Sequence, residues 1–214
     1  MTDALTIRFA TPADAEALVM IYAPYVLNTA ITYEYVIPTP EEFAQRIQTY
    51  SRKHPYLVAE IQGIPVGYAY ACPLGSRPAF DWAVETAIYV REDCRGMGVG
   101  KALYEKLEAI LKAMGIRTVT AAVASVDHED PYLTDASIRF HLTVNGHTHR
   151  LVVVAVQLVS ERIVVTIYTG GGGGVGIQLI ERTRTIGNEG VTLIGLERCT
   201  HERQHLEVGQ TVSG

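Results

Sequence analysis

A glycine-rich turn between a strand-like and a helix-like segment constrains the fold of this chain most. Residues 95–100 read RGMGVG and follow an apolar run that ends at Val90. The apolar residues after the turn share one helical face: Leu103, Leu107, Ile110 and Leu111. Glycine permits positive φ, and a helix N-terminus presents unpaired N–H groups to an anion. The pattern predicts a mixed α/β domain with a phosphate or pyrophosphate site, although a tight turn without a ligand fits the isolated motif equally well.

The elements around this turn exclude two common phosphate-binding folds. Thr11 and Thr39, each followed by proline, predict the starts of two helices, the second running to about Ser51. Alternation predicts strands at 5–9, 56–62, 65–72, 83–90 and 117–124. Gly63 predicts a hairpin turn and Gly115 a helix C-terminus, and a last helix is predicted at 135–141. A dinucleotide-binding unit places its glycine motif directly after the first strand, and a P-loop ends in Gly-Lys-Ser/Thr. Neither arrangement is present here.

Composition limits the partners of the protein. The 214 residues carry a net charge of −5, without the basic excess that nucleic-acid binding requires. No signal-like segment opens the chain, and the apolar run at 151–159 is too short to cross a membrane. Three scattered cysteines, Cys72, Cys94 and Cys199, suit a reducing compartment. We expect a cytoplasmic protein that binds neither nucleic acid nor membrane.

Several further segments, in order and with ordinary spacing, resemble one family. They are residues 21–26 (IYAPYV), 29–34 (TAITYE), 56–60 (YLVAE), 67–71 (GYAYA), 80–82 (FDW), 84–90 (VETAIYV) and 136–141 (ASIRFH). Together with the turn at 95–100, they are similar to the GNAT superfamily of N-acetyltransferases, in its phosphinothricin/methionine sulfoximine (L-amino acid N-acyltransferase) branch. The resemblance covers about residues 5–141. It implies a mixed, mostly antiparallel central sheet flanked by helices.

The resemblance also implies a co-substrate, acetyl-CoA, and no metal. Its pantetheine would pair with the backbone of Ile88, Tyr89 and Val90. Its pyrophosphate would lie on the glycine-rich turn and its neighbour, that is, on Arg95, Gly96, Met97, Gly98, Val99, Gly100 and Lys101. Thr134, where many relatives carry asparagine, and Ser137 would add cofactor contacts.

Acetyl transfer needs a neutral amine, whereas the amine of a free amino acid is mostly protonated near neutrality. By resemblance, Glu85 is the general base and His141 a second catalytic residue, in a direct transfer to a small amino-acid-like amine. Without the resemblance, Glu85 could simply face solvent and His141 could be structural. Arg77 suits a substrate carboxylate or phosphinate, and Phe80 and Tyr33 complete the expected substrate contacts. A homodimer is expected by resemblance.

Two other functions remain open. The chain could be an acetyl-CoA-binding domain whose active site is impaired, or it could acetylate another amine, such as a polyamine or a protein N-terminus. An acidic groove would favour a polyamine, whereas a working Arg77 would favour a carboxylated substrate.

The amino-acid composition changes, and the family resemblance ends, at Leu142. Residues 142–214 contain no Lys, Asp, Pro, Phe, Trp or Met, and they depart from the ending that relatives share. We predict an acetyltransferase domain at 1–141 and an atypical extension at 142–214, either β-rich or disordered, that arose as a fusion, a divergent ending or a frameshift. Residues 142–169 hold two β-branched runs that could supply the missing terminal strands. The glycines at 170–174 and 176 predict a flexible linker, and residues 191–196 predict one more strand. An H-E-x-x-H motif at 201–205 lies too near the chain end to gain a distant third zinc ligand.

Overall fold

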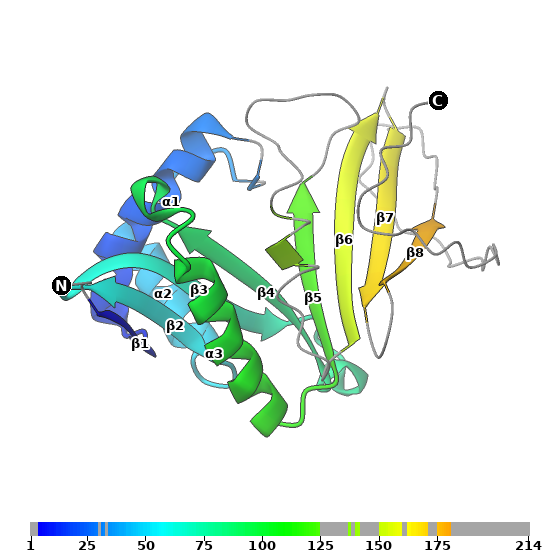
Figure 1. Ribbon diagram of the computed structural model, residues 1–214, viewed down its shortest axis with the longest axis horizontal. Coiled ribbons are helices and arrows are strands. Elements are labelled where there is room, and N and C mark those ends of the chain that lie inside the picture. The colour runs from blue at the N-terminus through cyan, green and yellow to red at the C-terminus, as the bar shows by residue number, and fades with distance from the viewer. Residues whose placement is uncertain are drawn as a thin grey trace.

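One mixed sheet organises the chain (Figure 1). The computed structural model describes residues 4–29, 31–32, 34–124, 137, 140–141, 150–159, 162–170 and 175–180, the last three ranges through their backbone. The strands lie side by side in chain order: β1 Leu5–Phe9, β2 Tyr56–Ile61, β3 Ile64–Pro73, β4 Ala83–Val90, β5 Thr118–Ala124, β6 Arg150–Val159, β7 Arg162–Gly170 and β8 Val175–Ile180. Only β4–β5 and β5–β6 are parallel pairs among them. The predicted mixed, mostly antiparallel sheet is confirmed.

Helices cover both faces of the first five strands. Helices α1 (Ala15–Asn28) and α2 (Pro40–Tyr50) pack on one face, and α3 (Val99–Ala113) packs on the other. Apolar residues spaced along α3 are fully buried against the sheet, as their periodicity predicted: Leu103, Leu107 and Leu111. On the opposite face, α1 and α2 bury Leu18 and Ile47 against tyrosines of β2 and β3. The sheet is therefore the middle of three layers.

The helix starts follow from capping chemistry. Thr39 caps α2 as predicted, because its hydroxyl accepts the Glu42 N–H at 3.2 Å while the Glu42 carboxylate accepts the Thr39 N–H at 2.8 Å. Thr11, however, does not start α1 directly. It caps a short 3-10 turn, Pro12–Asp14, and α1 begins at Ala15. The Asp14 carboxylate accepts the Thr11 N–H at 2.7 Å, which stabilises this tighter turn.

The connection between β2 and β3 is a tight hairpin turn. Gln62 and Gly63 have φ of 54° and 77°, the left-handed pair that a two-residue hairpin requires. Gly115, with φ of 79°, similarly ends α3. Both glycines were predicted to be turn residues.

Beyond β5 the sheet continues through residues of the atypical extension. The two predicted β-branched runs form β6 and β7, and β6 pairs with β5 from Thr118–Arg150 to Ala124–Val156. Of the flexible linker predicted at Gly170–Gly174 and Gly176, residues 171–174 lie outside the described residues, whereas Gly170 ends β7 and Gly176 pairs with Thr169 inside β8. Backbone pairing with β7 overrides the low strand propensity of glycine there. The strand expected at 191–196 lies outside the described residues.

Candidate active site

The parallel strands β4 and β5 separate soon after they start. They pair only at Ala83–Thr118, Val84–Val119 and Glu85–Thr120. Past Glu85, β4 diverges from β5, which keeps its pairing with β6 to its last residue. The remaining edge of β4 therefore has no strand beside it among the described residues. Such an edge presents N–H and C=O groups that an extended ligand can pair with.

The register with β3 decides which backbone groups of β4 face this gap. The Arg91 N–H donates to the Val66 carbonyl at 2.8 Å, so Arg91 and, two residues earlier, Tyr89 direct their polar groups toward β3. Ile88 and Val90 direct theirs toward the gap. Of the three residues expected to pair with pantetheine, the backbones of Ile88 and Val90 are the ones that face the gap.

The glycine-rich turn leads from the end of β4 into an open helix N-terminus. Gly96 and Gly98 adopt φ of 76° and 84°, and Gly98 is the N-cap of α3. Gly98 has no side chain with which to cap this end, and the first turn of α3 holds no acidic residue. The Gly98 carbonyl accepts the Ala102 N–H at 3.0 Å, which leaves the N–H groups of the first turn directed out of the helix. The turn therefore fits a pyrophosphate group.

The side chains around this turn are exposed, except for Val99, which is buried in the core. The Arg95 guanidinium lies 5.1 Å from the centre of the Tyr25 ring and 3.9 Å from the Glu92 carboxylate. Lys101 lies 3.8 Å from Glu105 on the surface of α3. Both cations are loosely paired, so both are available to an anion at the turn.

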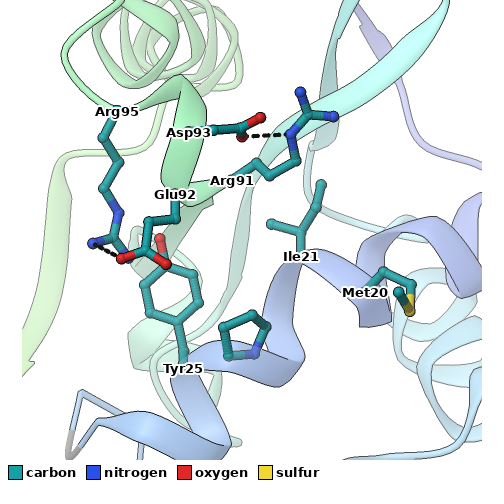
Figure 2. A pocket seen from close by; sticks show the side chains of 8 residues that line it. Met20, Ile21, Tyr25, Arg91, Glu92, Asp93 and Arg95 are labelled. Carbon is teal, nitrogen blue, oxygen red and sulfur yellow. Dashed lines mark hydrogen bonds and ion pairs between the residues drawn. The ribbon is translucent and has the colours of Figure 1, made fainter.

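An open pocket of about 360 Å³ lies between α1 and the end of the β4–α3 connection (Figure 2). Its lining comes from both segments: Met20, Ile21, Pro24, Tyr25, Arg91, Glu92, Asp93 and Arg95. In Figure 2, Arg95 and Tyr25 lie together on one side of the pocket, and Arg91 forms an ion pair with Asp93. The Arg95 end of the glycine-rich turn therefore contacts α1.

Glu85 stands where β4 and β5 part. It is the last β4 residue paired with β5, and it lies opposite Cys72 of β3. Val84 packs toward α3, so the neighbouring side chain of Glu85 points to the other face, and it is half-buried. Burial, together with the nearby Glu85 carboxylate, raises the pKa of the Cys72 thiol to about 11. Glu85 thus places a negative charge on the α1–α2 face at the mouth of the gap.

His141 lies on the opposite face from Glu85. Its ring packs edge-on against Tyr104 of α3, with 5.1 Å between ring centres, and only 4% of the residue is exposed. Tyr104 in turn shares a hydrogen bond of 2.6 Å with Thr86 of β4. Burial lowers the pKa of His141 to about 4, so its imidazole is neutral near pH 7. Its Nδ1 atom has no hydrogen-bond partner within the described part of the chain.

The expected substrate residues lie toward the other end of β4. Arg77 precedes a short turn, Pro78–Phe80, that leads into β4, and both Arg77 and Phe80 are exposed. The Phe80 ring lies over Gly75, where an added Cβ would come within 2.8 Å of it. The glycine-rich turn follows β4, whereas this loop precedes it, and Glu85 lies between the two.

Of the other expected contacts, Ser137 has helical backbone and is half-buried, while Tyr33 and Thr134 lie outside the described residues. The H-E-x-x-H motif at 201–205 also lies outside them. In the part that is described, no three His, Cys, Asp or Glu residues gather as metal ligands would. The helices there are also too short or too polar to cross a bilayer.

Sequence reasoning missed one residue of this region, Tyr25. Its hydroxyl donates to the Val90 carbonyl at 2.6 Å and accepts the Val90 N–H at 3.2 Å. In the sequence Tyr25 is one residue of the family-like segment 21–26, and it lies one helical turn after Ile21. Periodicity predicts that it is buried but does not indicate the strand that its hydroxyl reaches.

The comparisons with known proteins agree with this geometry. A family model described as an acetyltransferase (GNAT) domain matches residues 7–144. A phosphinothricin N-acetyltransferase of Streptomyces viridochromogenes is 33% identical over 144 residues, which cover 67% of this chain and 74% of the relative. An L-methionine sulfoximine/L-methionine sulfone acetyltransferase of Salmonella typhimurium is 31% identical over 138 residues, covering 64% and 77%.

A solved structure extends the likeness to the fold and to the co-substrate. The phosphinothricin acetyltransferase of Sinorhizobium meliloti, solved in complex with AcCoA, is 34% identical, with a TM-score of 0.60 over 66% of this chain and 74% of that one. The gap beside β4 and the open N-terminus of α3 fit the same co-substrate. This chain belongs to the GNAT family and is an acetyl-CoA-dependent N-acetyltransferase.

Proposed function

We propose that the acceptor is a small amino-acid-like amine of the phosphinothricin or methionine sulfoximine type, with Glu85 as the general base. The position of Glu85 carries this proposal, because the carboxylate stands at the point where β4 leaves β5, between the glycine-rich turn and the Arg77 loop. The names of the relatives point to this substrate class. Arg77 is exposed and would bind a substrate carboxylate or phosphinate through its planar guanidinium.

The chain would contribute to the reaction in three ways. When bound, acetyl-CoA would supply a thioester: the neutral amine forms a C–N bond with its carbonyl carbon, the C–S bond breaks, and coenzyme A leaves as a thiolate that takes up a proton. Glu85 takes the proton from the bound ammonium group, directly or through one water, and so generates that neutral amine. The gap-facing backbone of Ile88 and Val90 aligns the pantetheine, and the Ile88 N–H is the candidate donor to the thioester oxygen.

We also propose His141 as a second catalytic residue. Because it is neutral and its Nδ1 has no hydrogen-bond partner among the described residues, it is suited to exchange a hydrogen bond or a proton. It approaches from the α3 face, whereas Glu85 approaches from the α1–α2 face. The two residues therefore act on different atoms of the reacting groups.

Thiol release from acetyl-CoA by the full-length chain tests the proposal. We expect turnover with phosphinothricin or methionine sulfoximine, little with spermidine, and a loss of about 100-fold or more in kcat for Glu85→Gln. Glu16→Gln, an equivalent change at an exposed position of α1, should leave kcat unchanged and serves as the control. Acetyl-CoA binding without turnover on any amine would instead identify an impaired cofactor-binding domain. Preferred turnover of spermidine would contradict the amino-acid class.

The organisation of the whole chain remains a proposal. We propose an acetyltransferase domain at 1–141 and an extension at 142–214 whose segment 142–169 supplies terminal strands. The parallel pairing of β6 with β5 supports the part of this proposal in which the extension supplies strands to the domain. By resemblance we further propose a cytoplasmic homodimer, which light scattering on the purified chain would test.

A further inference from the structure

A tyrosine hydroxyl occupies the unpaired edge of β4. The Tyr25 hydroxyl donates to the Val90 carbonyl at 2.6 Å and accepts the Val90 N–H at 3.2 Å. Both Val90 groups point away from β3 into the gap where β5 has already diverged. One side chain therefore supplies both the donor and the acceptor that a neighbouring strand would otherwise supply.

The same side chain also contacts the glycine-rich turn. The Arg95 guanidinium lies 5.1 Å from the centre of the Tyr25 ring, a cation–π distance. Figure 2 shows the two side chains together. The edge-on ring of Tyr89 packs against Tyr25 with 5.1 Å between centres. Tyr25 is only 8% exposed, so most of its surface is in contact with these neighbours. It thus contacts both parts of the proposed cofactor site, the strand edge and the cation of the turn.

We propose that Tyr25 is a placeholder for acetyl-CoA. This inference rests on the proposed function, in which the pantetheine pairs with the gap-facing edge of β4. In the free protein the hydroxyl satisfies Val90, and the Tyr25 ring holds Arg95. On binding, the pantetheine amide replaces the hydroxyl at Val90, and Arg95 turns from the ring to the pyrophosphate. Because the same exchange runs in reverse, Tyr25 promotes release of coenzyme A after the reaction.

A placeholder opposes binding, so its removal should strengthen binding. Tyr25→Phe keeps the ring and its contacts with Arg95 and Tyr89 but removes the competing hydroxyl. We expect the Kd for acetyl-CoA, measured by calorimetry on the full-length chain, to fall about 3- to 10-fold, the range expected for one net hydrogen bond. Tyr50→Phe is the control, because Tyr50 lies on α2 and its ring stacks on Tyr70 of β3. Its Kd should stay within twofold of wild type.

A shortened ligand separates the two parts of the site. The nucleotide 3′-phosphoadenosine 5′-diphosphate carries the pyrophosphate of coenzyme A but no pantetheine, so its Kd should be the same in Tyr25→Phe and wild type. Hydrogen exchange gives a second readout. The Val90 amide should be protected in free wild type, faster in free Tyr25→Phe, and protected in both once acetyl-CoA is bound.

Each contrary result has one meaning. The placeholder role is overturned if Tyr25→Phe binds acetyl-CoA with the same affinity as wild type or more weakly. It is also overturned if Tyr25→Phe binds the shortened nucleotide more tightly by the same factor as it binds acetyl-CoA. Unchanged exchange of Val90 in the free variant also overturns it. If wild type does not bind acetyl-CoA, the proposed function fails and the inference falls with it. If wild type binds acetyl-CoA and Tyr25→Phe binds it no more tightly, the placeholder role is rejected and the proposed function still stands.

Discussion

At the scale of single residues, two buried ionisable groups have altered pKa values for opposite physical reasons. The His141 pKa falls to about 4 because burial disfavours the imidazolium form. The Asp14 pKa falls to about 2 because the Arg8 guanidinium donates two hydrogen bonds to the carboxylate, at 2.6 and 2.9 Å. His141 lies at the candidate active site, whereas Asp14 belongs to the start of α1.

We predict that His141 stays neutral through the usual assay range. Its NMR titration should have a midpoint near pH 4, whereas exposed histidines titrate near 6.5. Since the unfolded state takes up this proton first, stability should decline as the pH falls from about 6.5 and the loss should be complete near 4. His141→Asn should remove that part of the decline. A His141 midpoint near 6.5 would contradict the buried position.

Asp14 should stabilise the protein through its bond to Arg8. Asp14→Asn should lower the free energy of unfolding at pH 7 by about 1 kcal/mol, a value reduced for solvent screening because the Arg8 side chain is 40% exposed. The carboxylate contributes fully above pH 4, and the difference from wild type should shrink as the pH falls toward 2. Asp93→Asn breaks an exposed pair with Arg91 and should leave urea midpoints unchanged. Equal losses in both variants would refute this account.

At the scale of elements, the start of α3 carries the chemistry of the turn. Gly98 caps the helix with φ of 84°, a conformation that only glycine adopts freely, and it has no side chain to cover the first N–H groups. Gly67 of β3 lets this end of α3 approach the sheet, because a Cβ there would lie 3.2 Å from the Val99 side chain. Both glycines thus help to position the open helix end over the end of β4.

A pair of glycine variants separates backbone strain from ligand binding. Gly98→Ala and Gly115→Ala each place alanine at positive φ and should each cost about 1–2 kcal/mol of stability. Only Gly98→Ala should also weaken acetyl-CoA binding, by about 10-fold, since it disturbs N–H groups that bind the charged pyrophosphate. Thermal unfolding and calorimetry check the two effects. Equal weakening in both variants would mean that the turn acts through stability alone.

At the scale of the whole molecule, one sheet includes strands from both sides of Leu142, where the amino-acid composition changes. Strand β6 lies between β5 and β7, and Val154 pairs with Ala122 on one side and Ile167 on the other. If the extension completes the fold, its strands should unfold together with the first five. If the extension is instead a separate unit, a disruptive substitution in β6 should leave acetyl-CoA binding unchanged.

Proline scanning of the extension decides between these two possibilities. Val154→Pro should remove a ladder hydrogen bond of β6, which has a neighbouring strand on each side, costing roughly 1–3 kcal/mol, and should lower both Tm and acetyl-CoA binding. Ile177→Pro in the edge strand β8 disturbs one side only and should cost less. An unchanged Tm in Val154→Pro would show that 142–169 does not complete the domain.

Local sequence determined most elements of this protein. Alternation predicted β1 to β5, the Thr39–Pro40 pair predicted the start of α2, and glycines predicted the hairpin and the end of α3, because these signals act over a few residues. The glycine-rich turn and the family resemblance together indicated the co-substrate. Propensity failed where pairing with a neighbouring strand decided the outcome, as at Gly176 in β8.

Only the tertiary structure decided how these parts meet. The separation of β4 from β5 after Glu85, the opposite faces of Glu85 and His141, and the reach of Tyr25 to Val90 depend on register and packing between distant segments. Tyr25 and Val90 are 65 residues apart, and no local pattern encodes that contact. Local propensity acts within one element, whereas a strand edge is left open or closed by the packing of all elements around it.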